Sequence, residues 1–179
     1  MMLDYYNPDD LDVRVAELLV ATVDGADDGV APQVQEVLRL LREKLGMDVV
    51  FVSEFVDGLR RFRMVDRAPD APPLEPGQAD PLEESWCQRV VDGRVPEYVH
   101  DAAPLVAAGQ APDTGVPIGT HISAPIRSAD GHAWGTLCCF AQQVRGEPRP
   151  EDLRRLKYSA QMLAAKLDET RAWPKLDPA

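Results

Sequence analysis

Two tight turns constrain the fold of this 179-residue chain more than any other feature. Asp57-Gly58 separates the runs MDVVFVSEFV and LRRFRMVDR, and Ala129-Asp130-Gly131 lies inside GTHISAPIRSADGHAWGTLCCFAQ. Runs of β-forming residues joined by such short turns pair as antiparallel hairpins. The first run is apolar on both alternating faces, which is typical of a strand that is covered on both sides. The sequence therefore predicts an antiparallel sheet with other elements on each face.

Helical spacing of apolar residues appears in three segments, 9–23, 32–45 and 150–173. Pro32 and Pro150 suit the first turn of a helix. Because these helices precede the first hairpin and follow the second, we predict an α+β fold with the terminal helices on one face of the sheet. The arginines of LRRFRMVDR are expected to face water, and Glu54 is expected to pair with Arg63 across the strands.

The segment between the hairpins is irregular. Residues 69–81 are rich in proline, LEESWCQRVVD predicts a short helix that ends at Gly93, and PEYVHDA predicts a short extended piece. This segment has to cover the second face of the sheet. A cap of loops and short helices over an antiparallel sheet leaves room for a cavity between the two.

Composition narrows the classes of partner. The net charge of −11 repels phosphate groups, which disfavours nucleic acid and anionic membranes as partners. No apolar run approaches the ~18–20 residues of a membrane span, and MMLDYYNPDD lacks the features of a secretory signal. Three cysteines, two of them adjacent, fit a reducing compartment. We therefore expect a cytoplasmic protein.

Three stretches in this order resemble the GAF domain, a small-molecule-binding and signalling module: LGMDVVFVSEFVDG, EESWCQRVVDGRVPEYVHDA and IGTHISAPIRSADGHAWGTLCCF. They look like the GAF domains that bacteria attach to signalling output domains. The resemblance implies an N-terminal helix and linker over 1–30, a GAF domain over 31–173 and a tail over 174–179. It further implies a sensory or regulatory module that binds an unidentified small molecule under the cap.

The resemblance also implies a set of pocket residues. In GAF modules related to phytochromes, the ligand meets alternating residues of the first strand and of the last two long strands. Matching FVSEF, THISAP and GTLCCF to those strands, and adding three residues of the cap, implies a pocket lined by Phe51, Ser53, Trp86, Tyr98, His100, His121, Ser123, Cys138 and Phe140. The cofactor, if any, is not specified, because the family binds cyclic nucleotides, tetrapyrroles, haem or small metabolites.

Cys87 is the main candidate for chemistry, but packing is the favoured interpretation. A reactive cysteine needs a nearby cation or a helix N-terminus, whereas Cys87 falls in the middle of its predicted helix beside Arg89. Bilin-binding GAF domains carry a histidine after their cysteine, and Gln88 stands there in this chain. The loop 100–119 lacks the cysteines that free methionine-(R)-sulfoxide reductase uses. We therefore predict no catalytic residue, with an enzyme of that type as an alternative.

Metal binding is not predicted. Cys138 and Cys139 should face opposite sides of one strand, so they cannot share an ion or readily bond to each other. The three histidines are scattered and do not supply the four ligands of a zinc site. Haem bound through a single histidine remains open beside an ordinary hydrogen-bonded role.

The last helix has a repeating apolar seam. Its members follow alternating steps of three and four: Leu153, Leu156, Ala160, Leu163, Leu167 and Thr170. Such a seam is typical of a coiled coil or a four-helix bundle, and the simpler interpretation is packing onto the sheet. The two are compatible, since a helix that covers the sheet can also pair with its twin. The seam predicts a homodimer through the terminal helices, with a signalling output protein as a possible further partner. A ligand-free dimerisation module is the second alternative function.

Overall fold

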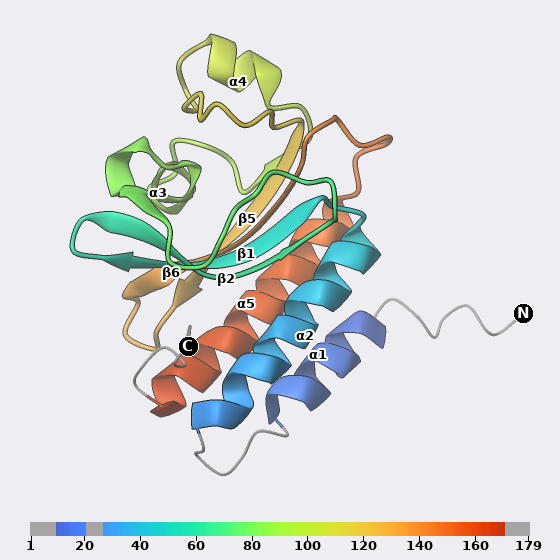
Figure 1. Cartoon of the computed structure of the whole chain (residues 1–179), viewed down its shortest axis with the longest axis vertical. Helices are drawn as coiled ribbons and strands as arrows, with labels where there is room; N and C mark the ends of the chain where they lie inside the picture. Colours follow the sequence, from blue (N-terminus) through green and yellow to red (C-terminus); the bar gives the residue numbers. More distant parts are fainter. Residues whose placement is uncertain (1–9, 21–26, 171–179) are drawn as a thin grey trace, which may run out of the picture.

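The computed structural model describes residues 10–20 and 27–170, and it has the predicted α+β architecture (Figure 1). Six antiparallel strands form one sheet in the order β3-β2-β1-β6-β5-β4. The long strands are β1 (Val49–Val56), β2 (Leu59–Arg67), β5 (Thr120–Arg127) and β6 (Ala133–Ala141). Two short strands, β3 (Ala79–Pro81) and β4 (Tyr98–Val99), form the edges.

The two faces of the sheet are covered by different kinds of structure. Helices α2 (Asp27–Leu45) and α5 (Pro150–Thr170) lie on one face of the sheet, and α1 (Asp10–Val20) packs against both of them from outside (Figure 1). The short helices α3 (Trp86–Val91) and α4 (Ala103–Ala107) and their connecting segments lie on the other face, where we call them the cap. None of the helices within the described ranges combines the length and hydropathy that crossing a bilayer requires.

The first hairpin turn has the predicted geometry. Asp57 and Gly58 both have positive φ, 53° and 74°, as a two-residue turn between twisted strands requires. Beyond this turn, β1 and β2 pair along their whole length, and their register shifts once, between Val52 and Ser53. Because of that irregularity, Phe62 on β2 packs towards the cap while Met64 packs towards the terminal helices.

Among the terminal helices, one boundary differs from the prediction. The second helix begins at Asp27, so Pro32 lies inside it and does not mark its first turn. A proline there removes one backbone hydrogen bond, which a helix of this length tolerates near its start. The last helix begins at Pro150 as predicted. Its predicted end near residue 173 and the predicted tail 174–179 lie outside the described residues.

Alternation along the central strands divides the buried residues into two cores. On one face, Val50 and Val52 of β1 pack with the terminal helices, and on the other face Phe51 packs with the cap. Further members of the helix-side core are Val15, Leu38, Leu41, Ile122, Leu137, Cys139 and Leu156. Further members of the cap-side core are Phe62, Cys87, Cys138 and Phe140. The strand faces inferred from the sequence are therefore those of the folded chain.

The seam of the last helix is not an exposed surface. Leu156 is fully buried, Leu163 is 4% exposed, and both pack in the helix-side core of the same chain. Ala160 and Leu167 are buried there too, Leu153 is partly buried, and the side chain of Thr170 lies outside the described residues. The interpretation of this seam as a dimer contact is therefore wrong, and packing onto the sheet accounts for it.

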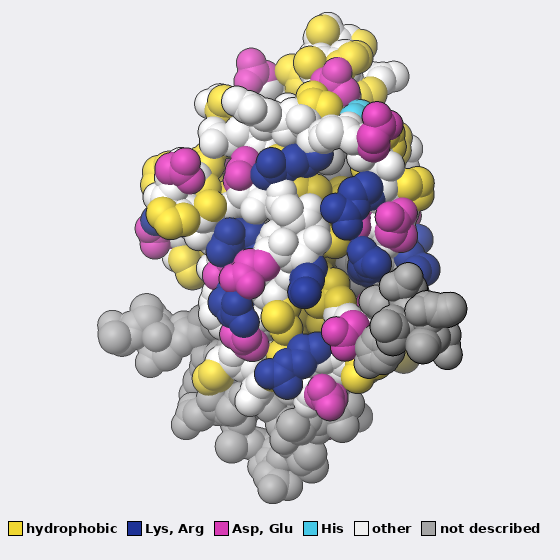
Figure 2. Space-filling model, turned by 90° about the vertical axis from the view of Figure 1, so that its right-hand side faces the viewer, with side chains coloured by type: hydrophobic (Ala, Val, Ile, Leu, Met, Phe, Trp, Pro, Cys, Tyr) yellow, Lys and Arg dark blue, Asp and Glu magenta, His cyan; other side chains and the backbone are white. Residues whose placement is uncertain are grey.

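Charged side chains are interspersed on the face that Figure 2 shows, with Lys and Arg lying beside Asp and Glu. Several pairs link elements that are distant in sequence. Arg42 of α2 contacts Asp66 of β2 at 2.5 Å, and Arg145 contacts Asp48 at 3.2 Å. The predicted pair of Glu54 and Arg63 is present, with 3.5 Å between Oε1 and Nη1.

Candidate functional site

The helix of the cap that carries Cys87 is shorter than predicted. A 3-10 turn over Leu82–Glu84 is followed by Ser85, whose hydroxyl accepts a hydrogen bond from the backbone N–H of Gln88. Ser85 therefore caps a new helix, α3, whose second residue is Cys87. Cys87 lies in the first turn of α3 and not in the middle of a longer helix, which corrects the sequence-based placement.

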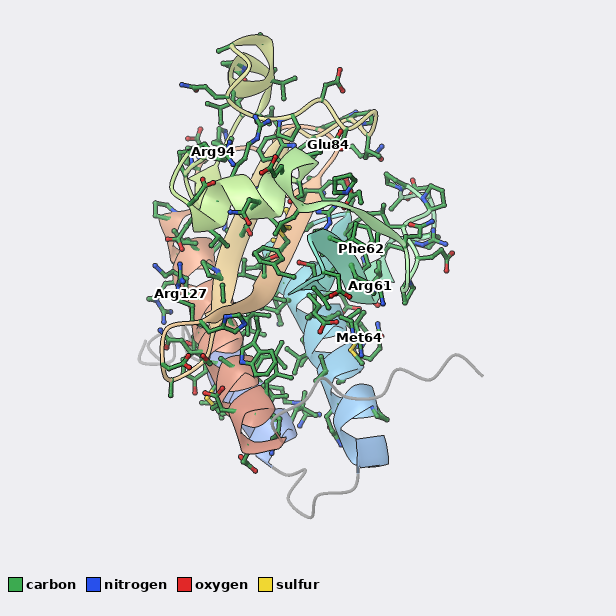
Figure 3. All side chains as sticks on the ribbon, turned by 90° about the vertical axis from the view of Figure 1, so that its left-hand side faces the viewer. Arg61, Phe62, Met64, Glu84, Arg94 and Arg127 are labelled. Atoms are coloured by element: carbon green, nitrogen blue, oxygen red, sulfur yellow. The ribbon has the colours of Figure 1, made fainter. Side chains whose placement is uncertain are left out.

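A cavity of about 400 Å³ lies between the sheet and the cap, within the range of small-molecule pockets. Its walls come from β1, β2, β5 and β6 below and from α3 and residues 74–80 and 114–118 above. Its lining residues are Phe51, Arg60, Phe62, Leu74, Gln78, Ala79, Asp80, Trp86, Thr114, Val116, Ile118, His121 and Phe140. Figure 3 shows Phe62 at the cap side of β2, with Met64 nearer the terminal helices. The cavity is thus mostly aromatic and aliphatic, with charge concentrated at Arg60 and Asp80.

Arg60 does not face water, contrary to the prediction for the arginines of β2. The residue as a whole is 7% exposed. Its guanidinium donates hydrogen bonds to both carboxylate oxygens of Asp80, at 3.0 and 2.6 Å. The guanidinium carbon lies 4.5 Å from the ring centre of Phe62 and 5.6 Å from that of Phe51. Nη1 also donates to Cys87 Sγ at 3.4 Å. Arg60 is one of nine lining residues that the sequence analysis did not name, and it is the one that brings a positive charge to the cavity wall.

The sequence did contain a signal for Arg60. Alternation places it on the same side of β2 as Phe62, an apolar residue that is expected to be buried. Burial alone opposes the charge of Arg60, but the Cys87 sulfur and the Asp80 carboxylate raise its pKa further above its ordinary value. The guanidinium is therefore a permanent positive charge at the cavity wall.

Cys87 of α3 and Cys138 of β6 meet beside the cavity, with 3.8 Å between their sulfur atoms. Burial opposes ionisation of Cys87, yet the Cys138 thiol and the charge of Arg60 lower its pKa below the usual value for a cysteine. Burial and the neighbouring Cys87 raise the pKa of Cys138. The burial of Cys87 agrees with the packing interpretation, but the cation beside it is one of the conditions that activate a thiol.

His121 occupies the wall between this cysteine pair and the cavity. Its ring is 2% exposed, lies 4.5 Å from the Trp86 ring, and places Nε2 at 3.6 Å from Cys138 Sγ. Burial, with the charge of Arg60 as a second cause, lowers the pKa of His121 to about 3. The imidazole is therefore neutral at physiological pH.

This neutral histidine makes stability depend on pH. In the unfolded chain His121 takes up a proton below about pH 6.5, whereas the folded protein resists it until about pH 3. The unfolded state binds more protons in that window, so the free energy of unfolding falls as the pH drops, by about 2 kcal/mol between pH 8 and pH 5. Urea denaturation of wild type and His121→Asn across this range should show that the difference between them follows this curve. His132→Asn, which replaces an exposed histidine, is the control and should leave the pH dependence of the free energy of unfolding unchanged.

The nine pocket residues inferred from the sequence fall into three groups. Four line the cavity, namely Phe51, Trp86, His121 and Phe140. Three lie on the same face of the sheet but are fully buried and do not line the cavity, namely Ser53, Ser123 and Cys138. The remaining two, Tyr98 and His100, do not line this cavity.

Tyr98 and His100 are displaced because β4 is a two-residue edge strand and not part of the cavity wall. The ring of Tyr98 packs against the helix-side core, and its hydroxyl accepts a hydrogen bond from the backbone N–H of Arg149. The backbone carbonyl of His100 accepts a hydrogen bond from the Thr120 hydroxyl. The placement of these two residues in the cap wall is therefore wrong.

Within residues 10–20 and 27–170, no three His, Cys, Asp or Glu side chains converge as they would around a metal ion. The structure separates Cys138 and Cys139 as predicted: Cys138 belongs to the cap-side core and Cys139 to the helix-side core.

Comparison with known proteins gives one family. The sequence model of the GAF domain matches residues 34–168. A comparison with curated proteins finds no match. The GAF domain of an Acinetobacter phosphoenolpyruvate-protein phosphotransferase is similar in structure, with 12% identity, a TM-score of 0.71, and coverage of 94% of this chain and 96% of that one.

Two further solved structures are also similar. A putative GAF sensor protein from Burkholderia vietnamiensis has 15% identity and a TM-score of 0.68, with coverage of 90% of this chain and 94% of that chain. The phycoerythrobilin-bound GAF domain from a cyanobacterial phytochrome has 17% identity and a TM-score of 0.69, with coverage of 92% and 96%. Structural similarity at 12–17% sequence identity establishes the fold of this chain and nothing about its ligand.

Proposed function

This chain belongs to the GAF domain family, and we propose that it is a sensory or regulatory module that binds a small organic molecule between the sheet and the cap. The observation that carries the proposal is the cavity of about 400 Å³, which has aromatic walls and a buried guanidinium. Burying a charge is costly, so a charge at the cavity wall favours a binding role over simple packing. The phycoerythrobilin-bound relative supports the proposal, since it is a similar domain that holds a ligand.

The cavity wall favours a ligand with a flat or apolar body and an acidic group. Phe51, Phe62 and Trp86 offer ring faces and edges for the body. Contacts with Asp80 and Cys87 occupy three of the five N–H donors of Arg60, so two donors are available to a ligand oxygen. A carboxylate would pair with such donors better than a neutral group would.

The sheet offers a route from the cavity to the terminal helices. His121 and Phe140 line the cavity. Their neighbours in the chain, Ile122 and Cys139, point to the other face and pack in the helix-side core with Leu156 of α5. Ligand binding that reorders the cap over residues 69–120 would thus shift strands that contact α5 directly. We propose that this shift is the signal read by an output protein.

Self-association through the terminal helices remains a prediction. Because the seam of α5 is buried in the core, a homodimer would use the outer surfaces of these helices. Val13 of α1, which is 54% exposed, is a large apolar side chain on such a surface.

The ligand proposal is tested on the full chain with a panel of small aromatic carboxylic acids and their neutral amides. We expect at least one acid to raise the melting temperature and its amide to bind at least tenfold more weakly, a difference of about 1.4 kcal/mol. Val116→Trp fills part of the cavity wall and should abolish the shift. Val144→Trp, at a position that is 46% exposed and does not line the cavity, is the matched control and should preserve it. Equal binding by wild type and Val116→Trp would refute the pocket.

A further inference from the structure

The sulfur pair beside the cavity joins the cap to the sheet, since Cys87 belongs to α3 and Cys138 to β6. We propose that these two cysteines are a redox pair, in which a hydroperoxide oxidises Cys87 and the resulting Cys87–Cys138 disulfide ties α3 to β6. This reaction does not depend on which ligand the cavity takes.

The geometry selects this pair among the three cysteines. The two sulfur atoms are 3.8 Å apart, so they must approach by about 1.8 Å to reach the length of a disulfide bond. Cys139 lies on the opposite face of β6, in the helix-side core, and cannot replace its neighbour. Closing the remaining distance requires α3, a helix of six residues, to move towards β6.

The surroundings of Cys87 differ from those of a cysteine that only fills space. Arg60 Nη1 donates to its sulfur at 3.4 Å, and the Ser53 hydroxyl lies 3.8 Å from it. These contacts favour the thiolate, which is the nucleophilic form. Burial and the adjacent Cys87 raise the pKa of Cys138, which therefore stays a thiol. The pair thus contains one thiolate that attacks and one thiol that resolves.

The chemistry balances with a hydroperoxide as oxidant. The Cys87 thiolate attacks one peroxide oxygen and the O–O bond breaks, which gives a sulfenic acid on Cys87 and a hydroxide or alkoxide that takes a proton from water. The Cys138 sulfur then attacks Cys87 Sγ, the S–O bond breaks, and the hydroxide leaves with the Cys138 proton as water. Two electrons pass from the two sulfurs to the peroxide. A dithiol reductant reverses the bond by two exchange steps.

The cavity provides the approach to the pair. Both sulfurs are fully buried, but Arg60 contacts Cys87, His121 contacts Cys138, and both of these contacting residues line the cavity. The side chains of Arg60 and His121 therefore separate the cavity from the sulfurs, and the reaction requires them or α3 to move so that a hydroperoxide reaches Cys87. The disulfide would then hold α3 against the sheet and restrict the cap.

The test treats the reduced full chain with hydrogen peroxide under native conditions, followed by acid quenching, alkylation in denaturant and peptide mass spectrometry without reduction. We expect free thiols to fall from three to one per chain and to return to three after dithiothreitol. Trypsin leaves Cys87 in peptide 68–89 but leaves Cys138 and Cys139 together in 128–145. Cys139→Ser is therefore the matched variant, and it should still give the linked peptides.

Two further measurements separate the redox role from packing. Cys138→Ser should stop the reaction at a sulfenic acid on Cys87, which dimedone traps. Hydrogen exchange of the amides of 86–91 should slow in the oxidised wild type and recover on reduction, a readout that needs no substitution. The proposal is overturned if the native chain keeps three free thiols until it is denatured, or if the bond that forms includes Cys139.

Discussion

Leu156→Asp is expected to unfold the domain and not merely to dissociate a dimer. Leu156 is fully buried between α5 and the sheet, where an aspartate would find neither water nor a cationic partner among its apolar neighbours. The cost of burying such a charge, together with the lost packing, exceeds about 4 kcal/mol. That is comparable with the whole stability of a domain, which is about 5–15 kcal/mol. Urea denaturation followed by circular dichroism measures it directly.

Val13→Asp is the matched control for this substitution. It puts the same charge on a terminal helix at a side chain that is 54% exposed, so stability should stay within about 0.5 kcal/mol of wild type. If the outer surfaces of the terminal helices form a homodimer, sedimentation velocity should show that Val13→Asp weakens it while the fold persists. A folded, monomeric Leu156→Asp protein would contradict the buried assignment of the seam.

Arg60→Met is expected to lower stability by about 2 kcal/mol, because it removes charge-assisted hydrogen bonds to the half-exposed Asp80 carboxylate and to the buried Cys87 sulfur. The loss stays modest because solvent can hydrate the Asp80 carboxylate and Cys87 can take a proton when the cation is lost. The same substitution should raise the pKa of Cys87. A pH titration of thiolate ultraviolet absorbance reports that pKa once the signal of a Cys87→Ser protein has been subtracted.

Arg61→Met provides the comparison, since it makes the same change on the next residue of the same strand. The side chain of Arg61 does not line the cavity, and the guanidinium that contacts the Cys87 sulfur is that of Arg60. We expect a smaller loss of stability and an unchanged thiolate titration. Equal effects of the two substitutions on the Cys87 titration would show that Arg60 is not the charge that favours the thiolate.

Local patterns in the sequence are sufficient for the elements and the faces of this fold. Asp57-Gly58 produces the predicted hairpin because few residues other than glycine, asparagine and aspartate tolerate the positive φ angles of that turn. Alternation assigns Phe51 to the cap side and Val52 to the helix side because successive side chains of a strand point in opposite directions. These features depend only on residues that are neighbours in the chain.

Contacts between distant segments required the tertiary structure. Cys87 and Cys138 are 51 residues apart in sequence, and they meet only because the cap folds back onto β6. The same closure turns Arg60 into a cavity residue, while the position of β4 at the sheet edge takes Tyr98 to the opposite core. A heptad seam likewise has the same spacing whether its partner is another chain or its own sheet, so Leu156 could be assigned only once the sheet was in place. The elements thus follow from local backbone preferences, whereas the cavity follows from which elements pack together.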